Sequence, residues 1–235
     1  MIVHANNETG TMQPIAELAG IARERGCLVH TDAAQSVGKV RTKVRELGVD
    51  LLSVAGHKLY APKGVGALYV RRGTPLRPFV LGAGHERGLR PGTENVASIV
   101  ALGVACELAG KRLSVSGDAV RALRDRLWAR LLAVVPGLAL NGHETERLPN
   151  TLNVRFPGVT GSAVLGSAPE VAASTGSACH EGGRERASSV LLEMGLRPDE
   201  ALGSVRLSLG VATTTQDVDD AADVLTRGWR ALGSS

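Results

Sequence analysis

The sequence predicts an α/β fold joined to a smaller α+β domain, and three observations support this. Early in the chain, strand and helix patterns follow one another in the order strand–helix–strand, which is typical of βαβ units with a parallel sheet. From about residue 94 the pattern changes to long helices followed by shorter strands. The length of 235 residues is enough for one domain or two small ones. We therefore expect a partial large α/β domain over residues 1–110 and a small α+β domain over residues 111–235.

In the first domain, short apolar runs bounded by turn residues predict four strands, over residues 1–5, 27–33, 51–57 and 66–70. A helix is expected between Pro14 and Gly26, where apolar residues recur at helical spacing. The chain opens directly on an apolar strand, whereas a doubly wound sheet usually has more strands. We therefore expect a sheet that is entered part-way through its topology.

The second half of the sequence predicts three helices, over residues 94–110, 116–135 and 217–232. Shorter strands are expected over residues 151–156 and 204–210. A further helix is expected over residues 161–174, but Gly166 and Pro169 make it a poor one.

Composition excludes several classes of function. Hydrophobic residues make up 43% and charged residues 21%, as in ordinary globular proteins. The net charge of +4 is mild and no basic run is interleaved with aromatics, so we expect no nucleic-acid partner. The longest apolar run, residues 96–106, is shorter than the roughly 20 residues of a spanning helix. With no signal-peptide pattern either, the sequence predicts a cytoplasmic protein without a membrane partner.

The three cysteines lie far apart and form no CxxC motif. This spacing argues against a disulfide framework and against a structural metal site, and it favours a reducing compartment. Cys27 and Cys106 lie in apolar segments, where we expect small buried side chains. Cys179 lies instead in the polar, glycine-rich stretch STGSACHEGG, where we expect an exposed loop and where His180 would favour the thiolate.

Charged and polar residues follow two of the predicted strands. Asp32 comes at the carboxyl end of the strand at 27–33, where open α/β sheets bind ligands. Taken singly, Asp32 is also typical of a helix N-cap or a turn, and Gln35 of a capping box. Lys58 and its neighbour His57 follow the next strand, where a solvated lysine and a satisfied polar residue are the plain alternatives.

Together, these residues suit a pyridoxal phosphate site. A lysine that forms a Schiff base must be neutral, which requires a desolvated pocket around Lys58. An aspartate such as Asp32 can pair with the pyridine nitrogen and make the ring an electron sink. Gly56 and Gly64 would allow the backbone to approach a ligand closely.

Seven motifs, in order, carry a resemblance to a known family: NNETG, HTDAAQSVGK, GHKLYAPKGVGALYVRR, GHERGLRPGTEN, LPNTLNVRF, TGSACHEGG and VRLSLG. The set resembles the cysteine desulfurases of the class V aminotransferases, which are fold type I pyridoxal phosphate enzymes. The resemblance extends from residue 1 to beyond residue 210, and the selenocysteine lyases share most of it. It implies the large domain of a fold type I PLP-dependent transferase, N-terminally truncated, with the cysteine loop in the small domain.

The resemblance also implies roles for matching positions. Lys58 would form the Schiff base and act as the base on the substrate, and His57 would contact the cofactor phosphate. Asp32 would pair with the pyridine nitrogen and Gln35 with the phenolic oxygen of the ring. Asn7 would lie near the same oxygen and the substrate carboxylate.

Three further residues would complete such a site. Thr93 would reach the phosphate of the partner subunit, so the resemblance implies a homodimer. Arg206 would bind the substrate carboxylate, a task that suits a planar guanidinium, although a surface strand residue is the alternative. Cys179 would take sulfur from the substrate and pass the persulfide to an acceptor protein.

The sequence departs from the family pattern at its start and at residue 55. The family's N-terminal region, with its first strands, phosphate-binding loop and ring-stacking histidine, is absent from this sequence. Ala55 stands where the family often has a hydroxyl residue that contacts the phosphate.

The expected function is therefore that of a cysteine desulfurase. A selenocysteine lyase, or an inactive truncated or split member that binds a partner chain, is the alternative. The pathway served, whether iron–sulfur cluster assembly, tRNA thiolation or another, stays open at this point.

Overall fold

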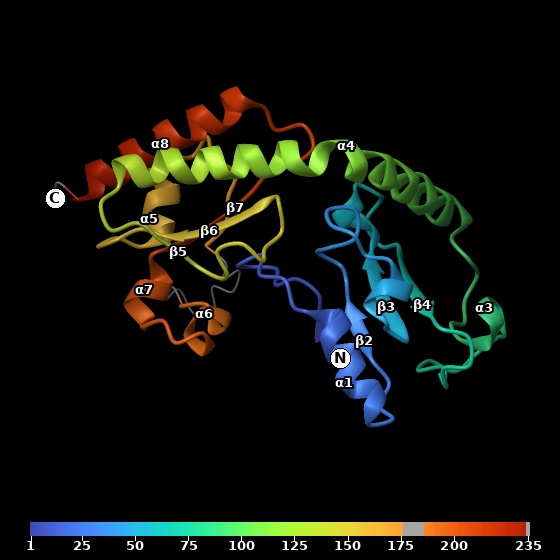
Figure 1. Cartoon of the computed structure of the whole chain (residues 1–235). Helices are drawn as coiled ribbons and strands as arrows, with labels where there is room; N and C mark the ends of the chain where they lie inside the picture. The colour runs from blue at the N-terminus through green and yellow to red at the C-terminus, as the bar shows by residue number, and fades with distance from the viewer. Residues whose placement is uncertain (176–185, 234–235) are drawn as a thin grey trace. The chain divides into compact units, whose positions relative to one another are not determined.

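The computed structural model describes residues 1–175 and 186–233, and the chain divides into two compact units (Figure 1). The first unit consists of Met1–Ala5 and Gln13–Ser114, and the second of Asn6–Met12 and Val115–Ser235. The segment Asn6–Met12, which contains the NNETG motif, therefore leaves the first unit and returns to it. The sequence pattern gives no sign of this excursion.

A four-stranded sheet forms the first unit, in the order β1 (Ile2–Val3), β2 (His30–Asp32), β3 (Leu51–Ala55) and β4 (Gly66–Val70). The pairs β1–β2 and β2–β3 are parallel, as the strand–helix–strand order predicts. The pair β3–β4 is antiparallel. A parallel pair needs a long crossover, whereas the short connection between β3 and β4 suits an antiparallel one.

Helices and turns cover this sheet. The first unit contains α1 (Ile15–Glu24), α2 (Val44–Leu47), the 3₁₀ helix η1 (Gly56–Leu59), α3 (His85–Gly88) and the first part of α4 (Val96–Val134). Helix α1 buries Ile15 and Ala19 against Val29 and Leu52 of the sheet side, because these apolar residues share one helical face. The end of α4 that belongs to this unit packs Leu102 against Leu59 of η1.

Helix α4 is one continuous helix, so the prediction of two separate helices over residues 94–110 and 116–135 is wrong. Gly110 and Gly117 weaken the helical pattern there, each by roughly 1 kcal/mol relative to alanine. Tertiary packing overrides this local preference, because Leu102 is buried in the first unit, and Leu127 and Leu131 are buried in the second.

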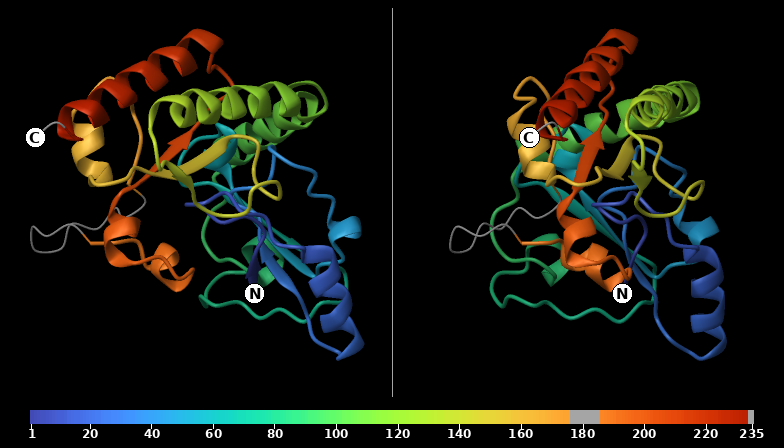
Figure 2. Two further views of the ribbon diagram at one scale, coloured as in Figure 1. Left: turned by 60° about the vertical axis from the view of Figure 1, so that its left-hand side comes forward. Right: turned by 90° about the vertical axis from the view of Figure 1, so that its left-hand side faces the viewer.

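The second unit contains a three-stranded antiparallel sheet of β5 (Ala139–Leu140), β6 (Thr151–Arg155) and β7 (Ser204–Ser208). Its helices are α5 (Gly161–Gly166), α6 (Ser189–Glu193), α7 (Pro198–Leu202), α8 (Thr215–Gly233) and the second part of α4. Helix α8 and this part of α4 run side by side (Figure 2), and Arg126 of α4 forms a bidentate ion pair with Asp219 of α8. The helix expected over 161–174 is restricted to α5, which ends before Pro169.

Two cysteines lie where the sequence analysis does not expect them. Cys27 and Cys106 are exposed, although each lies in an apolar segment. Cys27 follows the end of α1, and Cys106 lies on a face of α4 that also exposes other apolar side chains. Within the residues that the structure describes, no helix is long and apolar enough to cross a membrane.

Candidate functional site

Asp32 ends strand β2 and begins the turn that follows it. Its Oδ1 accepts a hydrogen bond of 2.8 Å from the amide of Ala34, and its carbonyl accepts one of 2.8 Å from the amide of His4. The turn alternative for Asp32 is therefore present, but no helix begins there and the N-cap alternative is wrong. Oδ2 has no hydrogen bond to a described residue, so this half-buried carboxylate can still pair with a cation.

Gln35 lies three residues further along the same turn, and its carbonyl groups contact Lys39. The Lys39 ammonium donates to the backbone oxygen of Gln35 at 2.8 Å and lies 3.4 Å from Oε1 of the Gln35 side chain. Burial, and second the positive charge of Lys58, lower the pKa of Lys39 to about 8. No sequence pattern singles out Lys39, although it lies at the end of the HTDAAQSVGK motif.

His57 and Lys58 lie on η1, directly after strand β3, and both are exposed. The desolvated pocket that the sequence predicts around Lys58 is therefore not formed by the described residues, which corrects that expectation. Tyr60, two residues after Lys58, has φ of 68°. This left-handed conformation costs a non-glycine residue about 1–2 kcal/mol, and such residues often cluster at functional sites.

Gly56 has a packing role, and its approach to a ligand stays a prediction. Its amide donates to the carbonyl of Val65 at 2.9 Å, and a Cβ at this position would lie only 2.7 Å from that oxygen. The glycine thus allows η1 to begin immediately beside the start of β4. Ala55, the position that departs from the family pattern, pairs with Gly66 across the two strands.

Thr93 is exposed and lines a cavity of about 610 Å³ in the first unit. The cavity lies between β4 and the start of α4, and its polar lining includes Arg90 and Asn95. An ion pair of 2.6 Å with Glu86 engages the Arg90 guanidinium. Glu86 also lines the cavity, so its carboxylate offsets the charge of Arg90 there, and the role of Thr93 toward a phosphate stays a prediction.

In the second unit, the structure brings Asn7 and Arg206 together. The Arg206 guanidinium on β7 donates one hydrogen bond of 2.9 Å to the backbone oxygen of Asn7. The neighbouring Asn6 forms the turn instead, because its Oδ1 accepts from the amides of Glu8 and Thr9. The Asn7 side chain is exposed, which leaves its amide available to a ligand.

Cys179 lies outside the described residues, but the chain on both sides of it is anchored in the second unit. Ser174 exchanges two backbone hydrogen bonds with Arg206, of 2.6 and 3.2 Å. On the other side, the Ser188 hydroxyl donates to the carboxylate of Glu8 at 2.5 Å. Both anchors thus involve Arg206 or the residue next to Asn7.

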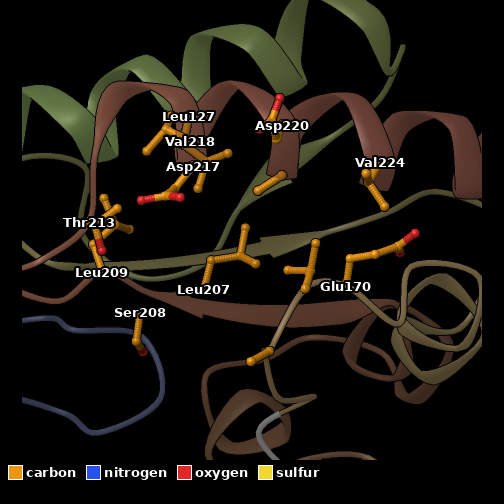
Figure 3. Close-up of a pocket in the computed structure, with 13 residues that line it drawn as sticks. Leu127, Glu170, Leu207, Ser208, Leu209, Thr213, Asp217, Val218, Asp220 and Val224 are labelled. Carbon is orange, nitrogen blue, oxygen red and sulfur yellow. The ribbon is translucent and has the colours of Figure 1, made fainter.

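A second cavity, of about 300 Å³, lies between α8, β7 and the segment that leads to Ser174 (Figure 3). Leu207 and Val218 form part of its apolar wall, and it contains none of the predicted site residues. The carboxylate of Asp217 is engaged there by the amide and hydroxyl of Thr214, which lower its pKa. Nor does the described part of the chain contain a group of three or more His, Cys, Asp or Glu arranged for a metal ion.

Comparison with known proteins assigns the chain to a family. The family model described as aminotransferase class-V matches residues 1–220. The chain belongs to the aminotransferase class-V family. The family resemblance and the fold class expected from the sequence are thus confirmed.

Among curated members of the family, a cysteine desulfurase of Gluconacetobacter diazotrophicus is 48% identical over 226 residues, which is 95% of this chain and 56% of the relative. The cysteine desulfurase NifS of Azotobacter vinelandii is 48% identical over 220 residues, covering 93% of this chain and 54% of the relative. The chain thus spans just over half the length of these aminotransferase class-V relatives.

Solved structures agree with this assignment. A NifS-like protein from Rickettsia africae superposes with a TM-score of 0.88 at 28% identity, covering 97% of this chain and 61% of that one. SspA, solved in complex with cysteine, has a TM-score of 0.69 at 35% identity, covering 88% of this chain and 57% of that one. The fold is therefore that of the fold type I pyridoxal phosphate enzymes of the aminotransferase class-V family.

Proposed function

We propose that the protein is a pyridoxal phosphate-dependent cysteine desulfurase, which converts cysteine to alanine and leaves a persulfide on Cys179. The observation that carries this proposal is the donor set of the first unit, an aspartate, an amide and an exposed lysine at the ends of neighbouring strands. Curated relatives that are 48% identical to this chain over the aligned residues are cysteine desulfurases, which supports the same reaction over that of a selenocysteine lyase.

The chemistry of the donor set fits pyridoxal phosphate. The Lys58 amine would bind the cofactor aldehyde, Asp32 would hold a proton on the pyridine nitrogen, and Gln35 would donate to the phenolic oxygen. His57 would contact the phosphate. When bound, the cofactor supplies an electron sink for negative charge at the substrate α-carbon.

Arg206 and Asn7 would bind the substrate carboxylate. The guanidinium uses one N–H group for the carbonyl of Asn7, and its other N–H groups make no hydrogen bond to a described residue. These N–H groups would form a bidentate contact with a carboxylate. The exposed amide of Asn7 would add a donor beside it. Lys58 would take the proton from the substrate α-carbon.

Cys179 would act as the sulfur acceptor. It follows Ser174, whose backbone pairs with that of Arg206, by five positions in the sequence. The thiolate attacks the substrate sulfur, the carbon–sulfur bond breaks, and a sulfur–sulfur bond forms on Cys179. A proton then replaces sulfur on the substrate β-carbon, so cysteine and a thiol give alanine and a persulfide.

The proposal extends to the assembly and setting of the protein. Thr93, beside the 610 Å³ cavity, would reach the cofactor phosphate of a second subunit in a homodimer. A cytoplasmic setting would keep the Cys179 thiol reduced. The persulfide would then pass to a sulfur-acceptor protein. Iron–sulfur cluster assembly is the first pathway to test.

The test begins with visible absorption of the purified chain after addition of pyridoxal phosphate, and then measures alanine formed from cysteine. We expect the absorption band of a lysine-bound cofactor in the wild-type chain and its loss in Lys58→Ala. Cys179→Ser should keep the band but lose persulfide formation, because only the sulfur acceptor is removed.

Lys63→Ala is the matched control, since Lys63 is an exposed lysine of the same motif. It should keep both the band and the activity. A band that persists in Lys58→Ala, or alanine production that does not depend on Lys58, would contradict the proposal.

A further inference from the structure

Lys39 is a partly buried cation in the turn that follows β2, and its contacts are almost entirely local. Its ammonium donates to the Gln35 backbone oxygen at 2.8 Å and lies 3.4 Å from Gln35 Oε1. Among described residues, Lys58 on η1 is the charged group that lowers the pKa of Lys39, in addition to burial. His57 lies next to Lys58 on the same short helix. Since its pKa is about 8, Lys39 is mostly protonated at neutral pH.

The ammonium fixes which way the Gln35 amide points. A lysine ammonium has three donors and no acceptor, so Gln35 must turn its oxygen, and not its NH₂ group, toward Lys39. The NH₂ group then faces away from Lys39 with both of its donors available. A glutamine held in this way can donate to an anionic oxygen but cannot accept from a hydroxyl there.

Packing of the backbone brings Lys39 close to Lys58. Gly38 has φ of 78°, and a Cβ on it would lie 2.9 Å from Ala109 Cβ and 3.0 Å from Leu59 Cδ2. Leu59 follows Lys58 directly on η1. Only glycine therefore lets this turn pack tightly against both α4 and η1. This packing places Lys39 where the positive charge of Lys58 lowers its pKa.

We propose that Lys39 is a positioning residue of the cofactor site, which holds the Gln35 amide as a donor toward the anionic phenolic oxygen of pyridoxal phosphate and adds a second positive charge beside Lys58. This inference rests on the proposed function and deepens it. Both effects stabilise the cofactor after it loses the proton at its lysine-bound nitrogen. The NH₂ group of Gln35 stabilises the negative charge of the phenolic oxygen, which then has no neighbouring proton. The positive charge of Lys39 disfavours protonation of the lysine-bound nitrogen.

The first test needs no cofactor. Competitive acetylation of the full chain over a range of pH, followed by peptide mass spectrometry, measures the pKa of each lysine amine. We expect Lys58→Met to raise the pKa of Lys39 above about 8, because the neighbouring charge is removed. A Lys39 pKa that is the same in both proteins overturns the inference, since the two amines would then not interact.

The second test follows the visible band of added pyridoxal phosphate as a function of pH. We expect Lys39→Met to raise the apparent pKa of the band by about one unit, the size of a weakened hydrogen bond to a charged group. Lys39→Arg, which keeps a cation with N–H donors, should titrate close to the wild type. Lys43→Met, which removes an exposed lysine paired with Glu46, is the matched control and should not shift the band.

Two outcomes separate this inference from the proposed function. A wild-type band whose titration is the same in Lys39→Met overturns the positioning role alone. A wild-type chain without any lysine-dependent band overturns the proposed function, and the role of Lys39 with it.

Discussion

At the scale of single residues, Gly38 connects the turn after β2 to two other elements. It combines a left-handed backbone with contacts that leave no room for a methyl group. We expect Gly38→Ala to destabilise the first unit by about 2–5 kcal/mol, since the strained φ costs about 1–2 kcal/mol and the overpacking about 1–3 kcal/mol. Hydrogen exchange of peptides that span β2 and β3 measures the effect, because both tryptophans lie in the second unit.

Gly26→Ala distinguishes the cost of the strained φ from the cost of the overpacking. Gly26 has φ of 66°, but a Cβ there would meet no atom within 4 Å. This variant should therefore show only the backbone cost, about 1–2 kcal/mol. Equal destabilisation of both variants would mean that the close packing of Gly38 against Leu59 and Ala109 contributes nothing.

The residues of the candidate site differ in how far the sequence predicts them. Asp32, His57 and Lys58 stand out because strand ends and motif order mark them. Lys39 does not stand out, because its partner depends on how the turn folds. Its Nζ donates to the backbone carbonyl of Gln35, four residues earlier, in a turn that is not helical. Burial of Lys58 is predicted wrongly, because exposure depends on what packs around η1 and not on the motif.

At the scale of elements, helix α5 is positioned by a backbone contact that only glycine allows. A Cβ on Gly161 would lie 2.3 Å from the carbonyl oxygen of Ser204 on β7. We expect Gly161→Ala to destabilise the second unit by at least about 2 kcal/mol, because the obstacle is a strand backbone that cannot move aside. Urea unfolding followed by the fluorescence of Trp128 and Trp229, which pack against the core of this unit, measures the change.

Gly166, at the other end of α5, provides a control, because its substitution by alanine should change stability in the opposite direction. A Cβ there meets nothing within 4 Å and its φ is not left-handed, so alanine should stabilise the helix by about 0.5–1 kcal/mol. If Gly161→Ala proved as mild as Gly166→Ala, the α5–β7 contact would be looser than the structure indicates.

The elements themselves are predicted well where a pattern is long and local. Six strands and helices α1 and α8 follow from periodicity and turn residues, whereas β5 and the short helices α2, α3, α6 and α7 carry too few residues for a periodic signal. The continuity of α4 is a different case. Its glycines predict a break, and the buried leucines on either side, which belong to two separate cores, hold the helix together.

At the scale of the whole molecule, the NNETG segment limits what sequence order can reveal. Asn6–Met12 lies between two parts of the first unit but belongs to the second. Its hydrogen bonds explain this, since Asn153 donates to the carbonyl of Glu8 and Arg147 to that of Thr9. These partners lie far along the chain, so no local pattern encodes them.

The apolar surface of α4 predicts self-association. In the first unit, the side chains of Val96, Val100, Val104 and Leu108 are 64%, 60%, 52% and 43% exposed, and their spacing of four residues places them in one stripe. Contiguous apolar surface of this kind marks an interaction site. We expect the purified chain to associate reversibly, with sedimentation coefficients that rise with protein concentration.

Charges placed in the stripe should weaken this association. The double variant Val100→Glu, Val104→Glu should raise the concentration for half-association at least tenfold, because burying two valines contributes about 3 kcal/mol and tenfold corresponds to about 1.4 kcal/mol. Leu132→Glu is the control, since Leu132 is 48% exposed on the part of α4 that belongs to the second unit, away from the stripe in sequence. Circular dichroism would verify that all variants stay folded. Association that is unchanged in the double variant, or weakened equally by Leu132→Glu, would exclude the stripe as the contact surface and direct the search for the dimer interface to the cavity beside Thr93.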